Sequence, residues 1–405
     1  MKGAQRFVVA VVGLLALLAA SQVFAQDWPQ WRGPSRDGKV AGFKAPETWP
    51  KALTQKWKVT VGAGDASPVL VAGKLYIFAR QGDDEVTLCL DAADGKELWR
   101  DKNPVPAISG PASRQHAGPR STPAVADGKL VTLGVSGVLT CLNTADGKVL
   151  WRKDEIKGAP KFFTGSSPII VDGLVIAQLG PEGTGAIVAY ELATGKEKWQ
   201  CANQGAAYAS PVLTTAEGVK QIVTLTDKNV IGVAVADGKS LWSLAFAAGY
   251  NAATPIIVDG STVIVSGQGR GTKAIKIVKT DSGWTTQELW SSLVGVQFCT
   301  PLLKDGFLYA VSDKGNLFCL NAKNGETVWT DSNKLGNYGA MLDVGSAILA
   351  LHSKSELLVL KPGEKQYTEL AKYKVAEGAT FACPGLAGNK IFVKDQDSLI
   401  LWTLE

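Results

Sequence analysis

His116 and His352 are the only two histidines in this chain of 405 residues, so they are the first candidates for acid–base chemistry. A metal site built from several imidazoles is excluded by their number. A general base needs a partner and a nucleophile within ~3 Å. No Gly-x-Ser-x-Gly elbow or pair of carboxylates at fixed spacing accompanies His116. We therefore predict no catalytic residue and no metal, and assign His116 a binding or structural role.

The six cysteines could form three disulfides in an exported protein, but their positions argue against pairing. Cys89, Cys141 and Cys319 each lie six residues before the glycine of one repeated turn, where sister repeats carry Ala189 and Gly232. That position requires a small residue, and equivalent positions in different repeats are too far apart to be bridged. We predict buried free thiols.

Charge and composition describe an ordinary folded chain. The sequence holds 42 Lys and Arg against 37 Asp and Glu, for a formal charge of +5, and 46% of its residues are hydrophobic. Since neither sign of charge dominates, the sequence does not support a nucleic-acid partner.

The first 25 residues read as a signal peptide, with Lys2 and Arg6 before the apolar run 7–20 and cleavage expected after Ala25. That run is shorter than the roughly 18 apolar residues of a membrane anchor, and no later segment is longer. No lipobox cysteine stands at the cleavage point, because the first cysteine is Cys89. We expect a periplasmic or secreted protein without a transmembrane segment.

The elements that must position any site belong to an internal repeat. A Ser/Thr-Pro or Cys-Pro element recurs at Pro68, Pro123, Pro168, Pro211, Pro255, Pro301 and Pro384, and Gly339–Leu342 fills the double interval before the last. A glycine turn is followed by tryptophan at Trp99, Trp151, Trp199, Trp242 and Trp329, with a divergent copy at Trp290. Short alternating runs between these landmarks predict four antiparallel strands per unit.

Eight units of roughly 47 residues predict an all-β, eight-bladed β-propeller with four-stranded antiparallel blades. The last unit, residues 384–405, has only three strands' worth of chain. We predict that the N-terminal strand 53–59, with Trp57, joins this C-terminal blade and closes the ring. A solenoid would instead require distinct capping units. Residues 26–405 then form one domain, in which residues 26–66 are the lead-in and the closing strand.

Seven tryptophans occupy the outer strands at one repeat position, which predicts packing between blades rather than stacking on a ligand. The seventh is Trp57. Three further indoles, those of Trp28, Trp31 and Trp49, are expected to pack the lead-in against the ring.

The repeat resembles that of the β-propeller proteins with pyrroloquinoline-quinone-like (PQQ-like) repeats. Ser/Thr-Pro, Asp-Gly-Lys and small-Leu-Asp/Asn-Ala-x-Asp/Thr-Gly-Lys-x-x-Trp recur in six near-complete copies, and residues 27–33 and 118–123 resemble the BamB-like exported bacterial subgroup. One branch of the family, the quinone-dependent dehydrogenases, implies PQQ with Ca²⁺ in the channel between a tryptophan floor and an adjacent-cysteine disulfide. This chain has no Cys-Cys pair. The other branch, BamB, implies a scaffold.

Strand order predicts two different faces. Turns joining strands one to two and three to four repeat almost unchanged on one face, whereas the inter-blade connectors and the loops joining strands two to three vary on the other. Binding is expected on the variable face, at the channel mouth. The predicted ligand-binding residues are Arg114, His116, Arg120, Tyr208, Tyr250, Asn251, Phe298, Tyr338, His352 and Lys394. Connector residues Gln115, Phe163, Gln297 and Phe381 are expected beside them. The alternative is that all of these are solvated loop residues and channel plugs.

Two functions follow. The first is an exported binding or scaffold propeller of the periplasm or cell envelope, acting as a monomer without a cofactor, whose ligand is an envelope protein or peptide or an anionic small molecule. The second is a redox enzyme with PQQ and Ca²⁺ in the channel, acting on alcohols or sugars. A lyase or hydrolase stays open, although no placed pair of carboxylates supports it.

Overall fold

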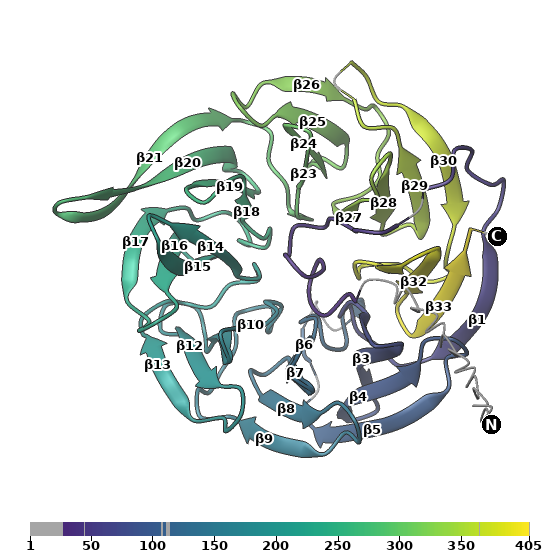
Figure 1. Ribbon diagram of the computed structural model, residues 1–405, viewed down its shortest axis with the longest axis horizontal. Coiled ribbons are helices and arrows are strands. Elements are labelled where there is room, and N and C mark those ends of the chain that lie inside the picture. The colour runs from purple at the N-terminus through teal and green to yellow at the C-terminus, as the bar shows by residue number, and fades with distance from the viewer. Residues whose placement is uncertain (1–26, 44, 107, 111–113, 364, 405) are drawn as a thin grey trace, which may run out of the picture.

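The computed structural model describes residues 27–404 apart from residues 44, 107, 111–113 and 364. Within that part of the chain no α-helix forms, and the strands make eight sheets arranged radially around a centre (Figure 1). The eight-bladed propeller is confirmed. The predicted cleavage after Ala25 lies outside the described residues and stays a prediction.

The first four blades each use four consecutive strands in the order of the chain. Their strands are β2 (Val69–Val71), β3 (Lys74–Gln81), β4 (Asp84–Asp91) and β5 (Glu97–Pro104); β6 (Ala124–Ala126), β7 (Lys129–Leu133), β8 (Leu139–Asn143) and β9 (Val149–Lys153); β10 (Ile169–Val171), β11 (Leu174–Leu179), β12 (Ala186–Glu191) and β13 (Glu197–Cys201); and β14 (Val212–Ala216), β15 (Val219–Leu225), β16 (Asn229–Ala234) and β17 (Ser240–Ala245).

The next three blades follow the same order, and blade seven gains the short parallel strand β22 (Phe298–Cys299) beside β27. Their strands are β18 (Ile256–Ile257), β19 (Thr262–Gly267), β20 (Gly271–Thr280) and β21 (Gly283–Ser292); β23 (Leu302–Lys304), β24 (Phe307–Val311), β25 (Leu317–Asn321) and β26 (Thr327–Thr330); and β27 (Tyr338–Asp343), β28 (Ile348–His352), β29 (Glu356–Leu360) and β30 (Glu369–Lys374). The β20–β21 hairpin projects beyond the ring (Figure 1).

The ring closes as predicted. Blade eight combines β31 (Gly385–Ala387), β32 (Lys390–Lys394) and β33 (Ser398–Thr403) with β1 (Thr54–Thr60) from the other end of the chain. The register pairs Trp57 with Leu401 and Thr60 with Ser398. Blade eight is the blade that combines strands from both ends of the chain, so the pairing of β1 with β33 closes the ring.

Tryptophans pack each blade against the next. The rings of Trp57, Trp99, Trp151, Trp199 and Trp290 lie against the turn glycine of the following blade, so close that a Cβ there would overlap or press on the indole. These glycines have φ between 69° and 76°, which favours glycine. Each indole Nε1 donates to a backbone carbonyl in that same region, as from Trp199 to Val235 O at 2.8 Å. The predicted inter-blade packing is confirmed for these rings, whereas Trp242 donates to Gln221 of its own blade.

The Ser/Thr-Pro elements explain how the inner strands are held together. The backbone N–H of Ser67 donates to Thr122 Oγ1, that of Thr122 to Ser167 Oγ, and that of Ser167 to Ser210 Oγ. The N–H of Cys383 likewise donates to Ser67 Oγ. We call this arrangement the hydroxyl belt. In it, backbone N–H groups at the start of the inner strands donate hydrogen bonds to Ser or Thr hydroxyls of the neighbouring blade.

All six cysteines are buried and free, as predicted. Burial raises the pKa of the Cys89 thiol to about 11 and that of the Cys141 thiol to about 12, so both stay protonated and behave as small apolar residues.

Candidate functional site

Hydrogen bonds confirm that the propeller has two different faces. On one, the turn joining strands three and four bonds to the turn joining strands one and two, as Ala92 N does to Gly73 O. On the other, the loop joining strands two and three bonds to the inter-blade connector, as Gly315 O does to Leu335 N. We call these the repeated face and the variable face.

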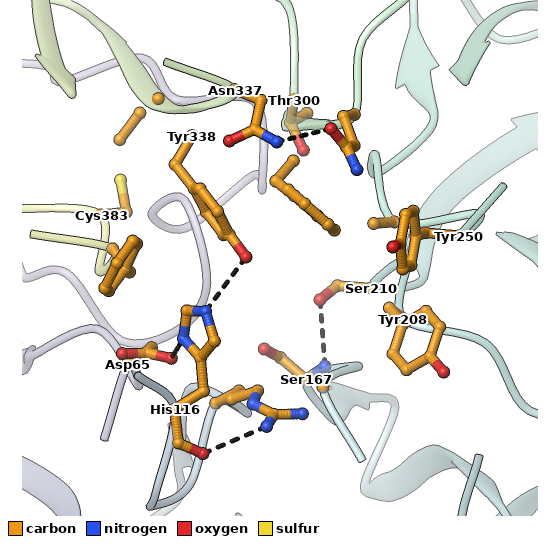
Figure 2. Close-up of a pocket in the computed structure, with 18 of the residues that line it drawn as sticks. Asp65, His116, Ser167, Tyr208, Ser210, Tyr250, Thr300, Asn337, Tyr338 and Cys383 are labelled. Carbon is orange, nitrogen blue, oxygen red and sulfur yellow. Dashed lines mark hydrogen bonds and ion pairs between the residues drawn. The ribbon is translucent and has the colours of Figure 1, made fainter. Parts of the chain in front are cut away.

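A cavity of about 530 Å³ lies at the centre of the ring and is lined by the connectors that precede the inner strands (Figure 2). Its wall is made of Trp31, Arg32, Asp65, Gln115, His116, Arg120, Phe162, Gly165, Ser167, Tyr208, Ser210, Tyr250, Ala252, Gln297, Phe298, Thr300, Asn337, Tyr338, Gly339, Ala340, Phe381 and Cys383. This volume is within the ~300–1,000 Å³ of small-molecule sites.

Seven half-buried rings, one from each of seven connectors, form a collar around the cavity. Neighbouring centroids are 5.5 Å apart for Phe162 and Tyr250, 4.9 Å for Tyr250 and Phe298, and 4.4 Å for Phe298 and Tyr338. The collar consists of His116, Phe162, Tyr208, Tyr250, Phe298, Tyr338 and Phe381. The eighth connector, between blades eight and one, contributes Asp65 instead of a ring.

Polar groups meet at the side of the collar where Asp65 lies (Figure 2). His116 Nδ1 is 2.6 Å from Asp65 Oδ2, and its Nε2 is 3.1 Å from the Tyr338 hydroxyl. Arg120 donates to His116 O at 3.1 Å and to Phe162 O. His116 therefore joins connectors from three blade junctions, and Arg120 fixes the backbone beneath two collar rings.

Burial decides the protonation of the collar tyrosines. It raises the pKa of Tyr338 to about 12, with Asp65 adding to the shift and Arg120 opposing it. It raises the pKa of Tyr208 to about 12 as well, although a hydrogen bond from Phe162 N opposes the shift. Both hydroxyls are neutral at physiological pH and can donate or accept hydrogen bonds. Burial also lowers the pKa of Arg120, an effect that Asp65 partly offsets.

The lead-in closes the channel at the repeated face. Asp27 bonds to the turn at Ala72, and Val40 N to Asp343 O, both on that face. Between them the segment crosses the centre of the ring (Figure 1). There Trp31 Nε1 donates to Thr254 Oγ1 at 3.0 Å, and Trp31 forms part of the cavity wall.

Two buried arginines of the lead-in hold it in the channel. Arg32 donates to Thr300 O and Pro301 O, each at 3.2 Å. Arg36 donates to Pro211 O at 2.8 Å and to the carbonyls of Ser167 and Pro168. Guanidinium groups suit this task because they carry several donors in a fixed plane and remain charged. The cavity is consequently blind, with its mouth on the variable face.

The structure brings together six of the ten predicted binding residues, since His116, Arg120, Tyr208, Tyr250, Phe298 and Tyr338 all line the cavity. Arg114 is exposed and lies outside it. Asn251 is buried and uses its amide to donate to Thr226 O and Phe246 O. Neither side chain lines the cavity, and that of Asn251 instead bonds the connector to the backbone of blade four.

His352 and Lys394 are also absent from the cavity wall. Both end the second strand of a blade and are 1% exposed. Lys394 Nζ donates to Gly62 O at 3.2 Å and to Gly64 O at 2.6 Å, which fastens the chain after β1 to blade eight. Burial lowers the pKa of Lys394 to about 8, and nearby carboxylates oppose that shift. The sequence places both residues at the inner loops of the variable face, but it does not show that their side chains turn away from the channel.

Sequence reasoning missed much of the wall, including the functional side chains of Trp31, Arg32, Asp65, Phe162 and Asn337. It expected Phe163, but that residue has φ 66° and the cavity wall takes Phe162 instead. The lead-in gave no repeat signal, so Arg32 could not be placed. Asp65, by contrast, lies just before the first Ser-Pro element, at the position where other connectors carry a ring.

The cavity residues do not fit a quinone–calcium pair. Asp65 is the one carboxylate on the wall, and His116 already bonds to it. Within the described ranges, no group of three or more His, Cys, Asp or Glu side chains could hold a metal. Cys383 lies on the wall as a free thiol, so no disulfide covers a ring there. Trp31 packs the lead-in against the ring, as expected, and it also lies on the cavity wall.

Comparison with known proteins agrees with the fold. A family model described as outer membrane protein assembly factor BamB matches residues 49–200 and 82–331, more than half of the chain. The BamB protein of Burkholderia pseudomallei is 24% identical over 366 residues, covering 85% of this chain and 86% of that relative.

Two solved structures share the architecture. BamB from Moraxella catarrhalis has a TM-score of 0.65 at 14% identity, over 87% of this chain and all of that one. Quinohemoprotein alcohol dehydrogenase from Comamonas testosteroni has a TM-score of 0.71 at 12% identity, over 93% of this chain and 80% of that one. At such identities these two matches show the fold alone.

The eight repeat blades define a PQQ-like repeat β-propeller, a class that includes proteins named as outer membrane assembly factors and others named as dehydrogenases. Within that class, the chain belongs to the family described as outer membrane protein assembly factor BamB. Among the residues that the structure describes, no helix has the length and apolar character to cross a membrane.

Proposed function

We propose that this chain is an exported propeller of the periplasm or cell envelope that binds a ligand in the blind cavity of its variable face, without chemical turnover. Its ligand is a protein segment or a smaller molecule. Export is supported by the predicted signal peptide. The binding role is supported by the relatives named as assembly factors, since such a name describes a protein that acts through its contacts.

The collar carries the proposal. Each of its seven rings is half-buried and leaves part of its surface toward the cavity. Apolar surface kept in water forgoes roughly 25 cal/mol per Å² of stabilisation, so folding alone gives no reason to place rings there. Seven connectors of different length and sequence each place a ring on the cavity wall, and a ligand that covers these rings would account for them.

A quinone-dependent dehydrogenase is the second function suggested by the repeat. Relatives of that kind share the propeller. No feature of the cavity favours it, because the wall has one carboxylate, already paired with a histidine. We therefore do not assign it to this chain.

Photo-cross-linking tests the proposal. A photoreactive residue replaces Gln115, which is exposed and lies on the cavity wall, in cells that export the full chain. The matched control replaces Lys148, whose side chain is 81% exposed on the repeated face. We expect adducts, of protein or of smaller mass, at position 115 and none at position 148, detected by mass spectrometry of the purified chain. Equal yields at the two positions, or none at either, would contradict the proposal.

A further inference from the structure

We infer that the cavity recognises the terminal sugar unit of a neutral oligosaccharide, an inference that rests on the proposed function and names the class of its ligand. Three features of the wall support it: the backbone of the inner strands is already occupied, rings alternate with polar side chains, and the cavity is closed at its base.

Several backbone groups of the inner strands already have partners and are not open to pairing with an extended peptide. Such pairing needs free N–H and C=O groups along a strand edge. Here the hydroxyl belt takes the N–H groups of Ser67, Thr122 and Ser167. The lead-in arginines take the carbonyls of Pro211 and Pro301, among others. Recognition must therefore come from the side chains of the wall.

Those side chains combine ring faces with groups that both donate and accept hydrogen bonds. Three connectors place an amide directly before a ring, in Gln115-His116, Gln297-Phe298 and Asn337-Tyr338, and all six residues line the cavity. Asn337 Nδ2 donates to Gln297 Oε1 at 2.5 Å, which orients that amide pair (Figure 2). A pyranose has the matching surface, since its C–H face packs on an aromatic face and its hydroxyls pair with amides.

The charged side chains of the wall make contacts within the protein, although the Nε atoms of Arg32 and Arg120 have no hydrogen-bond partner. Asp65 is bonded to His116, and Arg120 is held by two backbone carbonyls. Arg32 is likewise used by carbonyls of the inner strands. A neutral sugar can enter the cavity while all of these contacts stay in place. This conclusion departs from the anionic small ligand expected from the sequence.

The closed base of the cavity allows only the end of an oligosaccharide to enter. Because Trp31 and the lead-in close the base, a polymer cannot thread through the ring. One terminal unit can enter through the mouth while the rest of the chain stays outside on the variable face.

Saturation-transfer NMR with the full exported chain tests this inference, using cellotetraose, maltotetraose and tetra-N-acetylchitotetraose as neutral probes. We expect transfer to at least one probe, concentrated on the protons of a terminal unit. Tyr250→Ala removes a ring in contact with two others and should weaken binding about tenfold, or ~1.4 kcal/mol. The matched control, Tyr367→Ala, removes a half-buried tyrosine that packs on Trp329 outside the cavity, and should leave binding unchanged.

Tyr250→Phe keeps the ring and guards against a variant that fails to fold; it should retain at least part of the affinity lost in Tyr250→Ala. Absence of transfer to all three probes, transfer spread evenly along the probe, or equal binding by Tyr250→Ala would overturn the inference. If adducts still form at position 115 in that case, the binding function stands and only the sugar assignment fails. If neither is seen, both fail.

Discussion

The two faces of the ring are built by opposite rules. On the repeated face, equivalent hydrogen bonds recur from blade to blade, as Ala92 N to Gly73 O and Leu192 N to Gly173 O do. On the variable face, the connectors differ in length and sequence, yet seven of them place one ring at the cavity. Repetition of sequence therefore marks the contacts that hold the ring together, and convergence of unlike connectors on one place marks the proposed binding site.

The lead-in makes the two ends of the channel different. It occurs once, lies against the repeated face and ends the channel there. A symmetric ring of eight blades would leave an open channel, whereas this segment turns the channel into a cavity with a base. Its arginines bond to carbonyls of blades three, four and six, so one segment contacts inner strands from several parts of the ring.

The largest difference between the faces should appear in stability. Trp199 is 7% exposed, packs on the turn glycine Gly238 and donates to Val235 O. Trp199→Ala should lower the free energy of unfolding by about 3 to 5 kcal/mol, because it leaves a cavity between two blades. Chemical denaturation followed by circular dichroism measures this loss.

Trp31→Ala is the matched variant at the cavity. Its indole is half-buried on the wall, so its removal should cost clearly less than that of Trp199. An equal or larger loss for Trp31→Ala would mean that the site, and not only the repeat, carries ring stability, and the contrast between the faces would fail.

The sequence was sufficient for the features that repeat. The blades and the closure by Trp57 were predictable from the Ser/Thr-Pro elements, the turn glycines and the outer tryptophans. These residues recur in most repeats, so each type of contact has several copies in the sequence. The features that occur once were not predictable in the same way. Nothing local to Arg32 indicates that it reaches Thr300 and Pro301, more than 260 residues away.

The direction of side chains was the second feature that the sequence could not predict. The sequence placed Phe163 and Lys394 near the mouth by their distance from a strand end. A positive φ at Phe163 reverses the chain locally, and Lys394 points to the carbonyls of Gly62 and Gly64 instead of the channel. Both outcomes depend on backbone geometry that a strand pattern does not contain.

A smaller effect, dependent on pH, is expected on the variable face. Glu85 accepts a 2.7 Å hydrogen bond from Val135 N, which joins blade one to blade two. Burial raises the pKa of Glu85 from 4.5 to about 7, although that bond and Arg80 oppose the shift. Between these pH values the folded chain keeps a proton that the unfolded chain has released, so this group lowers stability as the pH rises.

Glu85→Gln removes that dependence. From pH 4.5 to pH 8, its free energy of unfolding should improve relative to the wild type by about 2 to 3 kcal/mol. Urea denaturation at the two pH values gives the difference. Glu377→Gln changes an exposed glutamate and serves as the control. A constant offset between Glu85→Gln and the wild type at both pH values would show that folding does not shift the pKa of this carboxyl.

The smallest effect separates two arginines of one connector. Arg114 is exposed and outside the cavity, so Arg114→Ala should change the free energy of unfolding by no more than about 0.5 kcal/mol and leave ligand binding intact. Arg120 instead holds the backbone of His116 and Phe162, and Arg120→Ala leaves both carbonyls without that donor, at a cost of about 1 to 3 kcal/mol. Denaturation and probe titration of the two variants side by side measure the contrast. If Arg114→Ala weakens binding as much as Arg120→Ala, the ligand extends beyond the collar onto the rim, and the site is larger than the cavity.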